Sequence, residues 1–301
     1  MSIQTLFDKM GIILTFDEPK TLSIVEVPVV SRPDPYVVRD RFVLCGEFLE
    51  HYHYNSPYIK GLPRIWHKKS SFVREKPQEQ MLDNNVKRAR SKIRRLVNSN
   101  SDLTCFLTLT YNRSMTDFVS SNAYFENFIK RLKRIYPQLK YLAVPEFQKN
   151  KDYYGNEKIG GGNIHYHLLC NYPLPNFENT LDLQKFERDF QYNIWQDGFV
   201  TFRQIDFVDN VGAYVCKYLG KQNFDKRLFK KKKFFYSRNL LLPLVVDNFY
   251  KICEFLNFFD VSAMDLKFEI SFDSEFFGSV LYKQYKMKNF KDFFSSKVVC
   301  T

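Results

Sequence analysis

The sequence predicts a mixed α+β fold, with a largely antiparallel sheet flanked by helices and with N- and C-terminal extensions. The chain has 301 residues, 45% of them hydrophobic and 31 of them Phe, which is enough for a large packed core. Amphipathic helical patterns alternate with short β-rich runs between about residues 83 and 221. Two of these runs follow one another across a Gly-rich loop, as in an elongated hairpin, which favours antiparallel pairing.

Local patterns support each predicted element. In the stretch 121–135, Phe125, Phe128 and Leu132 recur at helical spacing. Asp209 or Asn210 is positioned to cap a later helix. The expected helices are 83–97, 121–135, 181–195 and 210–221, and the expected strands are 104–111, 139–147, 162–170 and 198–206.

The composition along the chain predicts three regions. Residues 1–82 form an N-terminal region in which we recognise no clear chemistry. Residues 83–225 contain all of the well-defined patterns and form the central domain. Residues 226–301 open on a basic run and continue as an aromatic-rich C-terminal region.

The charge balance predicts a polyanionic partner. Lys and Arg number 45 against 33 Asp and Glu, a net charge of +12 with a pI near 9.2, which favours nucleic acid. Phe234, Phe235 and Tyr236 follow the basic run and are candidates to stack on unpaired bases. The alternative for any single basic run is a solvated surface. The basic residues that we expect to bind DNA are Arg94, Arg95, Arg131, Arg134, Lys230, Lys231, Lys232 and Lys233.

Several classes of protein do not fit the sequence. No stretch is long and apolar enough for a transmembrane helix, and the N-terminus has no signal-peptide pattern, so we expect no membrane partner and a cytoplasmic location in a bacterial host. The six Cys residues are scattered without a CxxC pair, which argues against a zinc ribbon and against a disulfide scaffold.

A His-Tyr-His motif is the most informative local feature. On a strand, His165 and His167 point to one face while Tyr166 points to the other. Two adjacent imidazoles form half of a divalent-metal site, and Glu146, at the end of the preceding strand, is the best candidate for a hard oxygen ligand. The alternative is a strand with two partly exposed histidines and a solvated carboxylate.

A second motif places two phenols on one helix. Tyr214 and Tyr218 are four residues apart and therefore share a face, and Lys217 lies beside them. A tyrosine can attack a phosphodiester when the phosphate is polarised and positive charge is near. The alternative is that both tyrosines are half-buried packing residues.

Taken together, these motifs resemble the HUH superfamily of rolling-circle replication initiators. The strand Thr108–Tyr111, Glu146, the strand with His165 and His167, and the helix Tyr214–Tyr218 stand in the family's order and approximate spacing. The chain looks most like the type found in filamentous phages, microviruses and related integrated or plasmid elements. The resemblance covers about residues 83–222 and implies an HUH endonuclease core.

The resemblance also implies a mechanism. A tyrosine, Tyr214 or Tyr218, would attack single-stranded origin DNA, leaving a 5′-phosphotyrosine link and a free 3′-OH, and later the strands would be rejoined. His165 and His167, with Glu146 as a third ligand, would hold Mg²⁺ or Mn²⁺, and Lys217 would contact phosphate. A host DNA polymerase and helicase would be partners, while Thr108 and Thr110 would only shape the site.

Other functions remain open at this stage. A single-strand transposase of the same superfamily would use the same chemistry, whereas a conjugative relaxase would usually show a third histidine near the pair. A DNA-binding protein without catalysis would bind DNA independently of metal, and a metal-dependent hydrolase would cleave without a covalent intermediate.

We interpret a second pair, His51 and His53, as surface sequence without a metal. Oligomeric state and origin sequence are not predicted.

Overall fold

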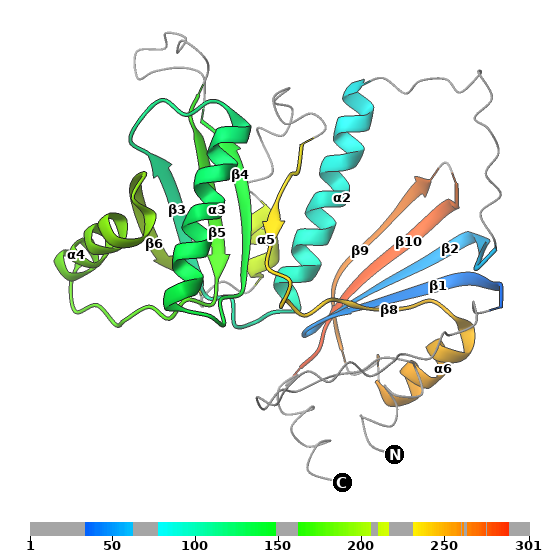
Figure 1. Cartoon of the computed structure of the whole chain (residues 1–301). Helices are drawn as coiled ribbons and strands as arrows, with labels where there is room; N and C mark the ends of the chain where they lie inside the picture. Colours follow the sequence, from blue (N-terminus) through cyan, green and yellow to red (C-terminus); the bar gives the residue numbers. More distant parts are fainter. Residues whose placement is uncertain are drawn as a thin grey trace, which may run out of the picture. The chain divides into compact units, whose positions relative to one another are not determined.

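The computed structural model describes residues 34–62, 78–148, 162–205, 210–216, 231–259, 261, 264–274 and 276–288 (Figure 1). The chain divides into two compact units. One contains residues 1–72 and 243–301, and the other contains residues 73–242. Each unit contains one five-stranded antiparallel sheet, and each is described by itself.

The unit of residues 73–242 carries the predicted motifs. Its sheet has the strand order β6-β3-β5-β4-β7, and every neighbouring pair is antiparallel. Its strands are β3 (Cys105–Tyr111), β4 (Tyr141–Phe147), β5 (Ile164–Cys170), β6 (Gly198–Gln204) and β7 (Phe235–Tyr236). Its helices are α2 (Gln78–Asn98), α3 (Phe118–Ile135), α4 (Thr180–Phe190), the π-helix η1 (Gln191–Trp195) and α5 (Val211–Cys216).

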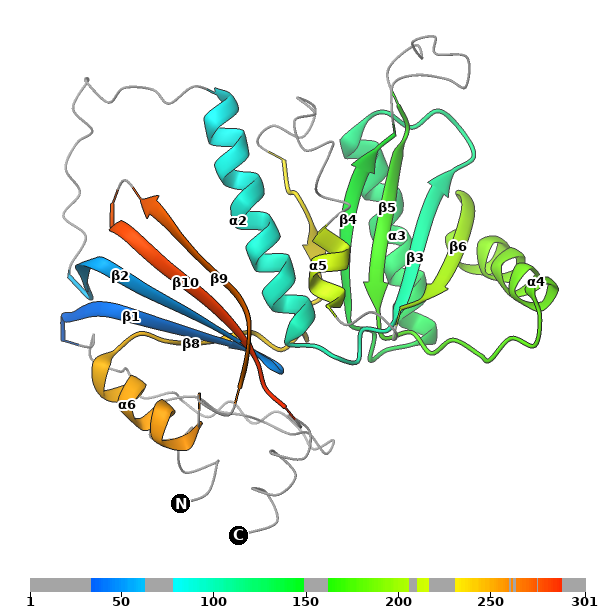
Figure 2. The same ribbon diagram turned by 180° about the vertical axis from the view of Figure 1, so that it is seen from behind.

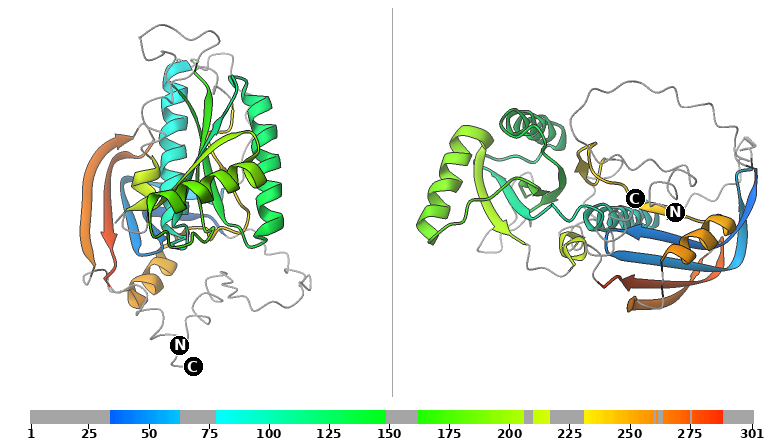
Figure 3. Two further views of the ribbon diagram at one scale, coloured as in Figure 1. Left: turned by 90° about the vertical axis from the view of Figure 1, so that its left-hand side faces the viewer. Right: turned by 90° about the horizontal axis from the view of Figure 1, so that it is seen from below.

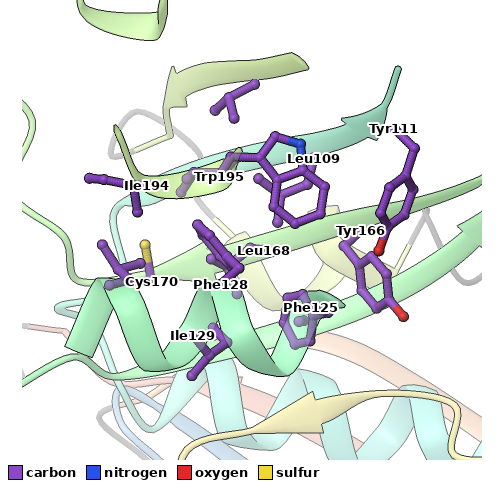
Figure 4. Packing of buried hydrophobic residues seen from close by; sticks show 14 of the residues in the cluster. Leu109, Tyr111, Phe125, Phe128, Ile129, Tyr166, Leu168, Cys170, Ile194 and Trp195 are labelled. Atoms are coloured by element: carbon purple, nitrogen blue, oxygen red, sulfur yellow. The ribbon is translucent and has the colours of Figure 1, made fainter. Parts of the chain in front are cut away.

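One face of this sheet is the main core of the unit (Figure 4). Tyr166 of β5 is fully buried there and stacks on Phe125 of α3, with ring centroids 4.4 Å apart. The Tyr166 hydroxyl donates to Asn122 and lies 3.1 Å from the Ser121 hydroxyl, so its polar end is satisfied inside the core. Large apolar side chains buried in this way stabilise a fold by about 1.5–3 kcal/mol each. Helix α3 is therefore fixed on this face by aromatic packing.

The opposite face is covered by α2 and α5, as Figure 2 and the right-hand view of Figure 3 show. Ile93 and Leu96 of α2 and Val215 of α5 pack against Phe106 and Leu169 of the sheet. These sheet residues lie near the beginning of β3 and the end of β5. The two helices thus cover one end of this face, where the strands carry apolar residues.

The other end of the same face is open and polar. The strand register defines two rows of neighbouring residues across it. Along both rows the side chains range from partly buried to exposed, except for buried Val144 and His167. The His165 row consists of Glu146, His165, Thr110 and Phe199, and the His167 row consists of Val144, His167, Thr108 and Thr201.

The unit of residues 1–72 and 243–301 joins two distant parts of the sequence. Strand β2 (Phe48–Lys60) pairs with β1 (Tyr36–Cys45) on one side and with β10 (Gly278–Lys286) on the other. The sheet order is β8-β1-β2-β10-β9, with β8 at Leu244–Val246 and β9 at Asp265–Ser274. Helix α6 (Phe249–Phe258) packs on it through Phe255, which contacts Phe42.

The predicted fold class is confirmed: the protein is an α+β protein with antiparallel sheets flanked by helices. In the central unit, every predicted helix and strand is present within a few residues of its expected position, although residues 217–221 of the last predicted helix lie outside the described part of the chain. The sequence suggested three consecutive regions, whereas the described strands of the first and last regions form one sheet. Pairing between strands more than 200 residues apart leaves no local pattern in the sequence.

A buried carboxylate directly after β8 links this strand to β1 and β2 of the same sheet. Asp247, only 6% exposed, accepts hydrogen bonds from Lys60 Nζ at 2.8 and 2.9 Å and from the Tyr36 hydroxyl at 2.7 Å. Burial raises the pKa of Asp247, but the hydrogen bonds from Lys60 and Tyr36 outweigh it, so the pKa is below its ordinary value of 3.8. Because the pKa of Asp247 is lower in the folded protein than in the unfolded chain, the ionised carboxylate stabilises the fold at pH values above the unfolded pKa. This stabilisation is lost as the pH falls through the pKa of the folded protein.

We expect Asp247→Asn to lower the free energy of unfolding by about 1–3 kcal/mol at pH 7, because it removes a charged acceptor from Lys60. The difference from wild type should shrink as the pH falls below about 4, where the native carboxylate becomes protonated. Urea unfolding followed by circular dichroism at several pH values measures both effects. Asp273→Asn, on exposed β9, is the control. A loss that is independent of pH would contradict the assignment.

Candidate active site

The predicted histidines lie on the open face of the sheet, as the alternation of β5 requires. His165 is partly exposed and His167 is 7% exposed, while Tyr166 between them is in the core. The large middle residue of the motif is therefore accommodated by the aromatic packing against α3. Burial raises the pKa of the Tyr166 phenol, so this tyrosine stays protonated and is excluded as a nucleophile.

Glu146 lies beside the histidines, on the strand paired with theirs. It is directly opposite His165 in the register, and its Oε2 lies 2.5 Å from Nε2 of His167. The loop that joins β4 and β5, residues 149–161, falls outside the described part of the chain, yet the register of the two strands is well defined. The carboxylate and the imidazole are therefore in direct contact.

Two threonines of β3 orient the imidazoles. The Thr108 hydroxyl lies 3.2 Å from Nδ1 of His167, and the Thr110 hydroxyl lies 3.5 Å from Nδ1 of His165. A threonine hydroxyl can either donate to or accept from a ring nitrogen, so Thr108 can satisfy Nδ1 of His167 in either tautomer. The sequence interpretation gave these threonines only a shaping role. The alternation of β3, with Thr at two positions on one face, was the signal that could have revealed the contact.

Helix α5 brings Tyr214 to the same face. The Tyr214 ring meets Phe106 edge-on at 5.9 Å, and Phe106 in turn stacks near His167 at 5.8 Å. Asn210 precedes the helix and caps it, because its side chain accepts a hydrogen bond from the backbone N–H of Ala213. Tyr214 is half-buried, in part as a packing residue. Lys217 and Tyr218 lie outside the described residues.

A glycine allows α5 to lie close to α2. A Cβ atom at Gly212 would lie 2.5 Å from Asn98 Oδ1 and 2.9 Å from the carbonyl oxygen of Arg94. Further along, the Cys216 thiol donates to the carbonyl of Arg90 at 3.3 Å. The two helices thus run side by side, and the position of Tyr214 depends on this close approach.

Of the three predicted metal ligands, Glu146 and His167 are in contact and His165 lies nearby. Among the residues that the structure describes, no group of three or more His, Cys, Asp and Glu side chains is assembled to hold a metal ion. Glu146 and His167 touch, and His165 lies on the same strand face. One carboxylate and two imidazoles on adjacent strands are a donor set that suits a divalent cation.

The predicted DNA-binding residues are distributed over both faces of the sheet. Arg94 and Arg95 lie half-buried on α2, on the side of the histidines, while Lys231 and Lys232 are exposed and Lys233 is partly exposed. Lys230 lies outside the described residues. Arg134 is exposed on α3, which covers the opposite face.

The structure gives Arg131 a role in the fold. Its guanidinium donates to the carbonyl oxygens of Ile194 and Trp195 at 2.7 and 2.6 Å, and it lies 3.7 Å from the carboxylate of Asp197. These contacts complete the last turn of η1, where carbonyls lack helical partners. Arg131 is thus engaged by the protein itself.

The aromatic residues after the basic run differ in their surroundings. Phe235 packs among Phe125 and Tyr166 in the core, whereas Tyr236 is 37% exposed and accepts a hydrogen bond from Lys92 at 3.1 Å. Lys92 lies 4.9 Å above the Tyr236 ring. Of the three predicted stacking residues, Tyr236 is therefore the one best placed for a partner.

The comparison with known families agrees with the geometry. Residues 104–223 match the family model described as Replication-associated protein ORF2/gene 2 protein. This segment is similar to that family. The match begins with the threonine strand and includes Glu146, both histidines and the Tyr214 helix. No curated protein and no solved structure matches the chain.

The similarity to this family supports a role in the initiation of DNA replication, and therefore DNA as a partner. The expected resemblance to a replication initiator is thus confirmed for residues 104–223, which are the part of the chain that contains the site, whereas the match does not test the HUH chemistry. Across the described residues, no helix is long and apolar enough to cross a membrane.

We expect Gly212→Ala to lower the free energy of unfolding by about 1–2 kcal/mol. Alanine normally stabilises a helix relative to glycine by about 1 kcal/mol, but here the added Cβ meets the backbone of α2, and overpacking costs about 1–3 kcal/mol. Thermal unfolding measures the effect. Ala213→Gly, at the exposed neighbouring position, reports the ordinary helix preference. An increase in stability for Gly212→Ala would contradict the close packing of α5 on α2.

Proposed function

We propose that the protein is an HUH endonuclease that initiates rolling-circle replication. It would nick single-stranded origin DNA through a tyrosine, remain joined to the 5′ phosphate, and later rejoin the strands. The proposal depends above all on the contact between Glu146 and His167, with His165 beside them on the open face and Tyr214 on the helix that packs there. The similarity of residues 104–223 to a replication-associated family supports the same role.

In this proposal Glu146, His165 and His167 hold a divalent cation, Mg²⁺ or Mn²⁺. The chemistry that such a cation supplies is polarisation of the scissile phosphate, which makes phosphorus more open to attack. The direct contact of Glu146 with His167 supports this assignment, because a carboxylate there reaches the imidazole nitrogen on the open face. The hydrogen bonds of Thr108 and Thr110 hold the other ring nitrogens, as outer partners of metal-ligating histidines often do.

The proposed nucleophile is the hydroxyl of Tyr214 or of Tyr218. Its oxygen bonds to phosphorus and the bond from phosphorus to O3′ breaks; the phenol loses its proton and the departing O3′ gains one. The products are a phosphotyrosine ester on the 5′ side and a free 3′-OH, so no water is consumed. Rejoining is the reverse, with a 3′-OH as attacker. Lys217 would contact the phosphate and stabilise the charge that develops on it.

Basic side chains on α2 and before β7 would hold the DNA strand. Lys87, Arg88 and Lys92 are exposed on α2, and Lys231 and Lys232 are exposed before β7. Contacts of this kind neutralise phosphates and make binding sensitive to salt. The 3′-OH left by the nick would serve a host DNA polymerase, with a host helicase to separate the strands.

A covalent-adduct assay tests the function. We expect wild-type protein and labelled single-stranded origin DNA to give a denaturant-resistant protein–DNA band with Mn²⁺ or Mg²⁺, and no band with chelator. Tyr214→Phe combined with Tyr218→Phe should abolish the band, because no phenol is left to attack. The two single substitutions then identify the attacking hydroxyl.

Other outcomes distinguish the alternatives. Cleavage without an adduct would identify water as the nucleophile. Tight binding of the correct origin with neither cleavage nor adduct would overturn the enzyme assignment in favour of a non-catalytic DNA-binding protein. Tyr192→Phe, an exposed tyrosine on η1, is the matched control and should leave the band unchanged.

Metal binding has a test that does not depend on activity. We expect His165→Ala with His167→Ala to weaken Mn²⁺ binding, measured by electron paramagnetic resonance of the free ion, by at least about tenfold. The second His-x-His pair offers a matched control, because His51→Ala with His53→Ala removes the same two side chains from another strand. Equal loss in both double variants, or no loss in the first, would refute the assignment of the metal to β5.

A further inference from the structure

The open face carries an aromatic side chain that neither the motifs nor the family assigns. Phe199 of β6 is 57% exposed, on the face of the sheet that carries the histidines. Single exposed apolar residues are common on protein surfaces, so the position of this residue is what matters. Phe199 is opposite Thr110 in the register and therefore belongs to the His165 row.

The distance within that row suits a nucleotide next to the cleavage position. Phe199 and His165 are separated by one strand, β3, so they lie two strand spacings apart, or about 10 Å. A phosphate at Glu146 and His165 would thus have an aromatic surface on one side of it, along the sheet. Beyond Phe199, the same face of β6 presents Thr201 and Arg203, both exposed.

The backbone that presents Phe199 is firmly anchored. The preceding Gly198 has a φ of +155°, and a Cβ there would lie 2.0 Å from the carbonyl oxygen of Thr110. The buried Trp195 donates its indole N–H to that same carbonyl at 3.2 Å. At the other side of β6, Glu187 of α4 accepts from the backbone N–H of Phe202 at 2.7 Å. An exposed aromatic ring on such a rigid support loses little conformational freedom when it binds.

We propose that Phe199 is a stacking platform for an unpaired base of the single-stranded DNA, next to the phosphate that the proposed enzyme cleaves, with Arg203 as a phosphate contact further along β6. This inference rests on the proposed function. Bases stack on aromatic rings with little dependence on sequence, because every base has a flat face. Phe199 would hold the strand in line with the His165 row and so position the scissile phosphate.

Binding of a labelled oligothymidylate of about 20 nucleotides, longer than common single-strand sites, tests the proposal without cleavage. In chelator, we expect Phe199→Ala to weaken binding by about tenfold, as loss of one stacked base does. Phe199→Trp should bind like wild type, whereas Phe199→Leu should bind like Phe199→Ala, because leucine is apolar but has no aromatic face. Ile135→Ala removes an equally exposed residue, 59%, from α3 on the opposite face, and should change nothing.

The salt dependence separates stacking from charge. Phe199→Ala should weaken binding by the same factor at low and high salt, since it removes no cation. Arg203→Ala should reduce the slope of log affinity against log salt by about 0.7, the value for one phosphate contact on a single strand. An oligonucleotide with 5-iododeoxyuridine should photo-crosslink to Phe199 in the wild-type protein.

Two results would overturn the proposal. One is wild-type affinity for Phe199→Ala, and the other is binding of Phe199→Leu that equals wild type, which would mean a general apolar contact. The adduct assay remains a separate measurement of the enzyme. An adduct with no effect at Phe199 refutes the platform alone, whereas a crosslink at Phe199 without any adduct supports the platform and refutes the nuclease.

Discussion

The register of β5 is the constraint on which the site depends. Because side chains alternate along a strand, a slip of one residue would place both histidines in the core and Tyr166 in solvent. The Tyr166 ring prevents this slip, since it stacks on Phe125 at 4.4 Å and its hydroxyl is hydrogen-bonded to Asn122. The aromatic core on one face thus determines which groups appear on the other. A residue that does no chemistry fixes the position of two residues that are proposed to do so.

The helices then divide the histidine face into a structural end and an open end. Ile93 of α2 and Val215 of α5 cover the apolar residues near the beginning of β3, while the His165 row is left accessible. The same packing brings Tyr214 onto Phe106, next to His167. The helix that closes the core is also the helix that carries the proposed nucleophile, and its closeness to α2 depends on the missing side chain of Gly212.

The sequence was sufficient for features that depend on local patterns. Alternation and helical spacing predicted the strands and helices of the central unit, and the hairpin-like order of β4 and β5 brought Glu146 to the histidines. It was insufficient where contacts are distant. Nothing near Arg131 in the sequence shows that its guanidinium would bind carbonyls of η1, some 60 residues away. Likewise, only tertiary packing turns Phe235 into the core while Tyr236 faces outward.

The two His-x-His motifs show why spacing alone does not define a site. His51 and His53 also share one face of a strand and also have a carboxylate on the neighbouring strand. There, a single oxygen of Asp40 is hydrogen-bonded to both rings, at 2.9 Å from His51 and 2.8 Å from His53. The Phe42 ring stacks on His51, with ring centroids 4.3 Å apart. In the central unit Glu146 contacts His167, each ring has its own threonine, and a tyrosine-bearing helix packs alongside. What distinguishes the proposed active site is therefore the set of neighbours that the sheet register supplies: oriented imidazoles, a carboxylate from the next strand, a phenol from the covering helix and an open row that leads to Phe199.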